Sequence, residues 1–202
     1  ACNKKECESI IEAKGLYHAG TIKPFDLVLK KGEVIGLSGL LGSGRSELAR
    51  AIYGADKPDD GELFVKGTKI LVSAPIDAMK HGMGYLPENR KEEGIIPELS
   101  VRENIVIALQ AKKGMFKLLS KKEQEEFTDE PPPGIDIGTK TEIQKLVLKL
   151  ASEGMSVMFI SSEIEEMIRT CSRMIVLRDG RKVGELEENE LSQMSIMKAI
   201  AG

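Results

Sequence analysis

One short segment restricts the fold of this chain more than any other feature of its 202 residues. The run Gly39-Leu-Leu-Gly-Ser-Gly-Arg-Ser46 matches the pattern G-x-x-x-x-G-K-[ST], except that Arg45 stands where the lysine is expected. The apolar run Val34–Ser38 before it is typical of a buried strand. Residues 46–53 after it carry apolar side chains at helical spacing and end at Gly54. A strand-to-helix connection is the context that this phosphate-binding motif requires.

The residue types in this segment suit the binding of a phosphate chain. Glycines let the backbone curl so that successive N–H groups point at phosphate oxygens, and the following helix directs its positive end at the same anion. The Ser46 hydroxyl can bind Mg²⁺, and Arg45 keeps the positive charge as a planar fork. We therefore interpret 39–46 as a site for ATP and Mg²⁺, and expect a side chain at Gly44 to fill the phosphate space.

The rest of the chain alternates strand-like and helical patterns. Glu62–Val72 is typical of a hairpin, Ser73 is expected to cap a short helix that ends at His81, and Met83–Leu86 is expected to be a strand. Further patterns predict a capping box at 100–103, helices around 143–150, 163–170 and 190–201, strands at 156–160 and 174–177, and a hairpin turn at 179–180. This order predicts an α/β domain with a largely parallel sheet and an antiparallel part.

Composition limits the class of protein. The net charge of −3 gives no general attraction to nucleic acid, and no apolar run approaches the roughly 18 residues that span a bilayer. The segment Ala1–Glu8 lacks the apolar stretch of a signal peptide, so a membrane role is expected to come through a partner. The cysteines lack metal-ligand spacing and are expected to be reduced thiols. His18 and His81 have no ligand partners at suitable spacing and are expected to lie at the surface.

Several motifs in order resemble the second nucleotide-binding domain of the fused ATPases of bacterial sugar importers. These belong to the ribose, xylose, arabinose and galactoside type of ABC transporter, whose C-terminal half commonly has arginine for the P-loop lysine. The matching stretches are Gly36–Leu48, Tyr53–Asp56, Gly61–Glu62, Ser73–Ala78, Gly84–Lys91, Ser100–Ile105, Asp129–Pro131, Gly134–Gly138 and Ile160–Glu163. The resemblance covers about residues 15–202. It implies one ABC-type P-loop domain over 1–202, with a mixed parallel core sheet, an antiparallel β subdomain and an incomplete helical subdomain at about 88–128.

The resemblance also implies a role for each site residue. Glu88 would occupy the Q-loop position, and Asp136 would be the D-loop aspartate that faces the partner domain. Asp129 would hold Mg²⁺ together with Ser46, and Glu130 would polarise the attacking water. Phosphate binding would fall to Gly39, Gly42, Ser43, Gly44, Arg45 and Ser46. Tyr17 is either the aromatic residue that stacks on adenine or an ordinary strand tyrosine.

The chain departs from the family pattern at positions that bear on ATP hydrolysis. Ser162 stands where active domains carry a switch histidine, and serine cannot hold a positive charge against the γ-phosphate. No L-S-G-G-Q-like signature is present, and the polar run 125–128 precedes Asp129 where a hydrophobic strand is expected. The resemblance therefore implies that residues are missing before Asp129, either because they are deleted or because the numbering runs across a gap in the chain. If the numbering runs across a gap, we predict a chain break near Phe127, with Asp129 still close to Ser46.

The function implied is that of an ATP-binding domain that couples ATP hydrolysis to the import of simple sugars. This domain would be a weakly hydrolysing half. Its partners would be a second nucleotide-binding domain in the same polypeptide, transmembrane permease subunits and, indirectly, a periplasmic sugar-binding protein, with no nucleic acid. It would lie in the cytoplasm on the inner face of the membrane. The alternatives are a non-transport ABC ATPase of DNA repair or translation, and a regulatory nucleotide-binding module. Neighbouring permease genes would favour transport.

Overall fold

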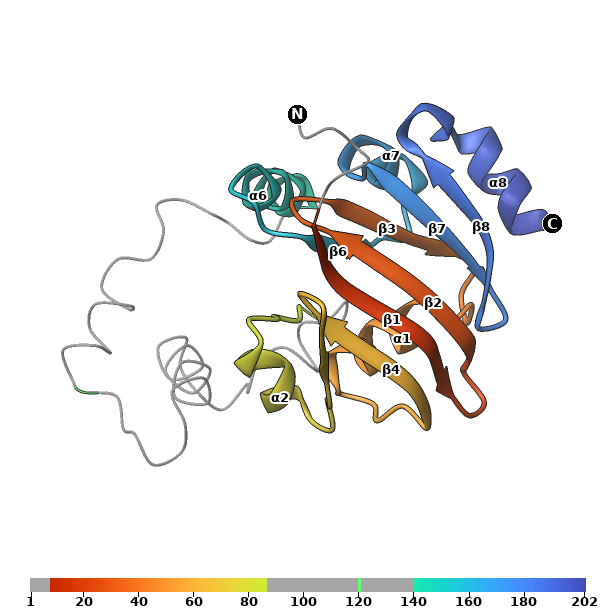
Figure 1. Cartoon of the computed structure of the whole chain (residues 1–202). Helices are drawn as coiled ribbons and strands as arrows, with labels where there is room; N and C mark the ends of the chain where they lie inside the picture. Colours follow the sequence, from red (N-terminus) through yellow and green to blue (C-terminus); the bar gives the residue numbers. More distant parts are fainter. Residues whose placement is uncertain (1–7, 87–119, 121–139) are drawn as a thin grey trace, which may run out of the picture.

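Two four-stranded sheets form the framework of the part of the chain that the structure describes. The computed structural model describes residues 8–86, 120 and 140–202. The first sheet is antiparallel, with the order β2-β1-β4-β5, and the second has the order β6-β3-β7-β8. In the second sheet β3 is parallel to β6 and β7, whereas β8 pairs antiparallel with β7 (Figure 1). The strands are β1 (Ser9–His18), β2 (Ile22–Lys30), β3 (Val34–Gly39), β4 (Asp60–Val65), β5 (Thr68–Ile70), β6 (Val157–Ile160), β7 (Arg173–Arg178) and β8 (Arg181–Glu187).

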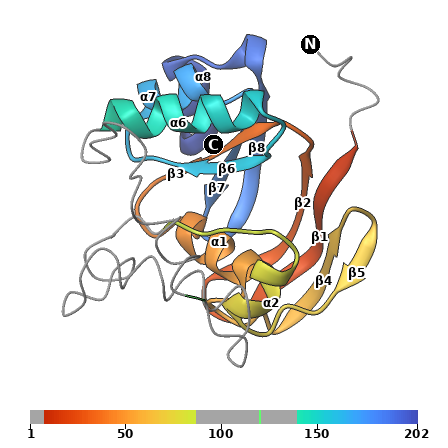
Figure 2. The ribbon, with the colours of Figure 1, turned by 90° about the vertical axis from the view of Figure 1, so that its left-hand side faces the viewer.

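Helices lie on both faces of the second sheet. Three of them, α6 (Lys140–Ser152), α7 (Ile164–Thr170) and α8 (Gln193–Ala201), cover one face, and α1 (Arg45–Tyr53) lies on the other (Figure 2). The short helix α2 (Pro75–Lys80) follows β5, and a 3₁₀ turn at Glu188–Glu190 precedes α8. The three covering helices bury apolar side chains against Val34, Met174 and Val176 of the sheet. The arrangement is a mixed α/β fold with a separate antiparallel sheet, as the sequence predicted.

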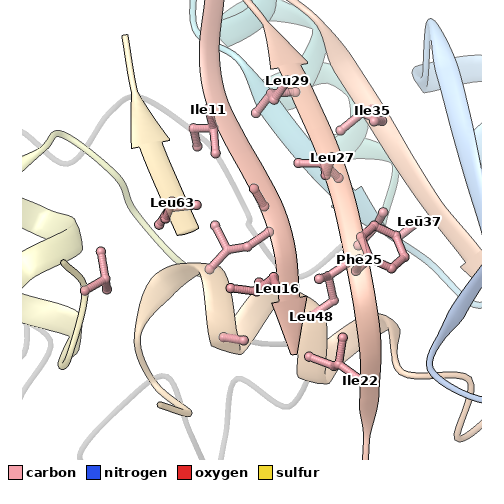
Figure 3. Close-up of a cluster of buried hydrophobic side chains, with 14 of the residues drawn as sticks. Ile11, Leu16, Ile22, Phe25, Leu27, Leu29, Ile35, Leu37, Leu48 and Leu63 are labelled. Atoms are coloured by element: carbon pink, nitrogen blue, oxygen red, sulfur yellow. The ribbon is translucent and has the colours of Figure 1, made fainter. Parts of the chain in front are cut away.

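The main core lies between the two sheets and includes one face of α1. Leu48 of α1 is fully buried, in the same cluster as Ile22 and Phe25 of β2 and Leu37 of β3 (Figure 3). Strand β3 and helix α1 flank the glycine-rich segment 39–46 on its two sides. Their packing therefore fixes both ends of that segment.

Replacing Leu48 with alanine should lower the free energy of unfolding by about 2–5 kcal/mol, because it leaves a cavity at the junction of both sheets and α1. Chemical denaturation followed by circular dichroism measures this change. Leu41→Ala is the matched control, since the Leu41 side chain is 99% exposed and its loss should cost less than about 0.5 kcal/mol. Equal losses in the two variants would contradict the placement of α1 between the sheets.

Most predicted elements are confirmed where the structure describes them. The strand before the glycine-rich segment, the helix after it and the β4–β5 hairpin are present, as are the elements from α6 to β8. The final helix begins at Gln193, later than expected, and Ser192 caps it. Strands β1 and β2 are not among the elements that the sequence patterns predicted. The alternation of buried Phe25, Leu27 and Leu29 with exposed neighbours was the available signal.

Two local predictions are wrong. Ser73 does not cap α2, because Ala74 occupies the N-cap position and no side chain caps the helix. The Asp77 carboxylate accepts a hydrogen bond from the Ser73 backbone N–H at 3.2 Å. Met83–Leu86 is not a strand. This segment is held by side-chain stacking, with the rings of Tyr85 and Tyr53 5.3 Å apart. The capping box at 100–103, the helical subdomain at about 88–128 and the junction near Phe127 lie outside the described residues.

Candidate functional site

The glycine-rich segment forms a tight loop between β3 and α1. Gly42 and Gly44 have φ values of 76° and 97°, in the left-handed region that glycine tolerates best. The Ser43 N–H donates to the Leu40 carbonyl at 3.0 Å, and the Leu48 N–H donates to the Gly44 carbonyl at 2.9 Å. The loop therefore turns sharply and leads directly into the first turn of the helix.

A cleft of about 350 Å³ lies over this loop. It is lined by Gly39, Leu40, Leu41, Gly42, Ser43, Gly44, Arg45, Ser46, Glu47 and Ser162. The structure therefore brings Ser162, which follows β6, to the predicted phosphate-binding residues although more than 110 positions separate them in the chain. Ser162 is exposed, so its hydroxyl is accessible from the cleft.

The Ser43 hydroxyl supports the presence of a ligand at this loop. The residue is only 4% exposed, and its Oγ has no hydrogen-bond partner among the residues that the structure describes. A buried hydroxyl without a partner is costly unless another group satisfies it. The loop otherwise offers glycine backbone and the start of a helix. These groups fit the phosphate chain of a nucleotide.

Gly44 is constrained by other parts of the backbone. A Cβ atom there would stand 3.1 Å from the Gly180 Cα and 3.1 Å from the Thr21 carbonyl oxygen. A side chain at Gly44 would therefore press on the β7–β8 turn and the β1–β2 loop. That it would also fill the phosphate space stays a prediction. These contacts involve backbone atoms of Thr21 and Gly180, which leave no residue-type signal in the sequence.

The Arg45 side chain leaves the loop and reaches the end of β6. Its Nη1 donates to the Ser161 carbonyl oxygen at 3.3 Å. The Ser161 hydroxyl donates to Glu166 Oε2 at 2.6 Å and accepts from the Glu163 N–H at 3.1 Å. Arg45 is thus connected to the turn that carries Ser162.

Tyr17 lies in β1 and is not among the residues that line the cleft. It pairs with Asp60 of β4, and its carbonyl accepts from the Asp59 N–H at 2.8 Å. Just beyond it, His18 Nδ1 and Thr21 Oγ1 are 2.9 Å apart in the loop that contacts Gly44. The backbone of Tyr17 thus takes part in ordinary strand pairing. Stacking of its side chain on adenine stays a prediction.

Four predicted site residues lie outside the part of the chain that the structure describes. They are Glu88, Asp129, Glu130 and Asp136. The predicted proximity of Asp129 to Ser46 likewise stays a prediction. Among the described residues, no group of three or more His, Cys, Asp or Glu side chains could hold a metal ion. No helix in the described ranges is long and apolar enough to cross a membrane.

Comparison with known proteins gives consistent results. The family model described as ABC transporter matches residues 22–159. A fructose import ATP-binding protein of Bifidobacterium longum is 43% identical over 95% of this chain and 46% of its own length. A galactofuranose transporter ATP-binding protein of Escherichia coli K12 is 38% identical over 90% of this chain and 45% of its own length. The chain thus spans about half the length of the curated relatives that it matches.

Solved structures show the same fold at low sequence identity. The cbiO1 protein of Clostridium perfringens, described as part of an ABC transporter complex, superposes with a TM-score of 0.69 at 17% identity, over 95% of this chain and 94% of its own. A dimeric bacterial ABC transporter cassette superposes with a TM-score of 0.65 at 23% identity, over 89% of this chain and 99% of its own. Both similarities concern the fold.

Proposed function

Because the chain belongs to the ABC transporter ATP-binding family, we propose that it is one nucleotide-binding half of an ATPase that drives sugar import. Its relatives are named as ATP-binding proteins for the import of fructose and ribose and the transport of galactofuranose. Since those relatives are about twice the length of the matched region, a second nucleotide-binding domain in the same polypeptide is part of the proposal. The complex would include membrane permease subunits, which places this domain on the cytoplasmic face of the membrane.

The cleft over the glycine-rich loop carries this proposal. Backbone N–H groups of the loop and the positive end of α1 would hold the phosphate chain of ATP. The Ser43 hydroxyl would gain the partner that it lacks among the described residues. Ser46 would offer its hydroxyl to Mg²⁺, which supplies charge neutralisation at the β- and γ-phosphates when bound. By family resemblance, Asp129 would support the metal, Glu130 would orient water, Glu88 would face the permease and Asp136 the partner domain.

Two residues at the cleft favour a weakly hydrolysing half. Arg45 replaces the compact ammonium of lysine with a planar fork, which changes the contact with the β/γ-phosphates. Ser162 lies at the cleft, as a switch residue should, but its hydroxyl brings no positive charge to the transferred phosphate. A regulatory nucleotide-binding module is the second candidate, and the same two residues favour it.

The length of the sequence alignment supports an incomplete helical subdomain. The alignment with the fructose relative runs over 237 positions, and this chain has 202 residues, so at least 35 positions of the relative have no counterpart here. The chain also lacks the signature sequence that closes the site of a partner domain. We propose that the missing positions fall before Asp129.

A matched pair of glycine variants tests nucleotide binding. Gly42 and Gly67 have φ values of 76° and 74°, and a Cβ at either would meet no atom within 4 Å. Alanine therefore brings similar backbone strain at both positions, but only Gly42 lines the cleft. We expect isothermal titration calorimetry to show MgATP affinity lowered about tenfold or more in Gly42→Ala and unchanged in Gly67→Ala. Absence of MgATP binding to the unmodified chain, or equal affinities in both variants, would contradict the assignment.

A further inference from the structure

The Arg45 side chain connects the phosphate-binding loop to the turn between β6 and α7. One amino group is bonded to the Ser161 carbonyl, and no other described residue accepts a hydrogen bond from the guanidinium. A guanidinium carries five N–H donors in a planar fork. Its remaining donors are therefore free of described protein partners, and they belong to a residue that lines the cleft.

Ser161 is fixed on its other side by α7. Its hydroxyl donates to the Glu166 carboxylate at 2.6 Å, a short charge-assisted hydrogen bond, and accepts from the Glu163 backbone N–H at 3.1 Å. The residue next along the chain from Ser161 is Ser162, which lines the cleft. Glu166 thus fixes Ser161, and the Ser161 carbonyl in turn binds Arg45. The same turn sets the position of Ser162.

We infer that Arg45 couples occupation of the phosphate site to the position of Ser162, and that Ser161 and Glu166 are positioning residues for this arginine. The guanidinium can keep one N–H on the Ser161 carbonyl while its other donors bind phosphate oxygens, because the fork presents them in different directions. Because Arg45 is then bonded both to the phosphate and to the Ser161 carbonyl, a movement of one displaces the other. The coupling rests on the proposed function, since it needs a bound nucleotide. The hydrogen bond from Arg45 to Ser161 is present without a nucleotide and does not rest on the proposed function.

Arg45 supplies at the cleft the positive charge that a charged side chain at position 162 would otherwise bring. Ser162 carries no charge, whereas the Arg45 guanidinium is charged, lines the same cleft and donates to the backbone carbonyl of Ser161, the residue before Ser162. A backbone acceptor does not depend on the side chain at position 162. The coupling is therefore compatible with the serine found there.

A double-mutant cycle with MgATP tests the coupling. Arg45→Ala should lower MgATP affinity about tenfold, the size of one charge-assisted hydrogen bond. Glu166→Ala should lower it about threefold to fivefold, and the double variant should lose no more than Arg45→Ala alone, because Glu166 acts through the arginine. Glu166→Gln keeps an acceptor for Ser161 and should restore most of the affinity. The matched control is Glu165→Ala, which removes only an exposed pair with Arg169 and should leave affinity unchanged.

Hydrogen exchange on the nucleotide-free chain tests the bond itself. Arg45→Ala should speed exchange of the Glu163 amide about tenfold, because that N–H is bonded to a serine that the arginine holds in place. Additive effects in the cycle would overturn the coupling, and unchanged Glu163 exchange would overturn the bond. If MgATP does not bind the unmodified chain, the proposed function fails and the coupling with it, while the exchange result still decides whether Arg45 holds the turn.

Discussion

Replacing Arg173 with alanine should lower the free energy of unfolding by about 3–5 kcal/mol, because it removes the partner of two carboxylates in a partly buried network. Arg173 is 7% exposed and begins β7. Its Nε donates to Glu33 Oε1 at 2.8 Å, its Nη2 donates to the Val28 carbonyl at 2.6 Å, and its Nη1 bonds Glu185. One guanidinium thus joins β2, β7, β8 and the residue before β3.

Urea denaturation of Arg173→Ala beside Arg169→Ala measures this effect. Arg169 lies on α7 and, among the residues that the structure describes, pairs only with Glu165 in an exposed ion pair, so its loss should cost less than about 0.5 kcal/mol. The comparison separates the loss of a positive charge from the loss of a buried link between sheets. A similar small loss in both variants would mean that the network contributes little to stability.

The same network predicts a dependence of stability on pH. Burial opposes ionisation of Glu185, but hydrogen bonds from Lys182 and Arg173 outweigh it and lower its pKa. A carboxyl group with a depressed pKa in the folded state stabilises the fold above its unfolded pKa of about 4.3, and this contribution disappears as the pH falls through the folded value. Acidification should therefore destabilise the parent chain more steeply in this range than Arg173→Ala.

Phosphate release from this chain with MgATP should stay far below about 1 s⁻¹, the lower end of ordinary turnover numbers. The chain has no signature sequence with which one cassette closes the site of another. Within its own cleft, Ser162 brings no charge to the γ-phosphate, and Arg45 presents a planar fork in place of the compact ammonium of lysine. A phosphate-release assay with MgATP in excess measures the rate.

Glu130→Gln is the control for that assay, because it removes the side chain proposed to orient the attacking water. Its residual rate should equal that of the parent chain if neither turns over. A parent rate near 1 s⁻¹ that disappears in Glu130→Gln would show instead that the domain is an active ATPase, and the proposal of a weakly hydrolysing half would be wrong.

Sequence alone was sufficient for the parts of the site that are local in the chain. Gly42 and Gly44 fall within one loop, and the left-handed backbone that they adopt is a property of glycine itself. The motif also required a strand before it and a helix after it, and both are present as β3 and α1. The family resemblance correctly indicated the mixed α/β fold. Short-range backbone preferences and apolar spacing carry this information directly.

Tertiary structure decided which distant residues meet, at the loop and elsewhere in the fold. The contact between Arg45 and Ser161 joins positions 116 residues apart, and that between Arg173 and Glu33 joins positions 140 residues apart. The close approach of Gly44 to Thr21 and Gly180 involves backbone atoms, which any residue type provides. Such contacts depend on how the two sheets pack around α1, and packing is a property of the whole core. The sequence therefore determined that a glycine-rich loop joins a strand to a helix, and the fold decided which turn Arg45 contacts.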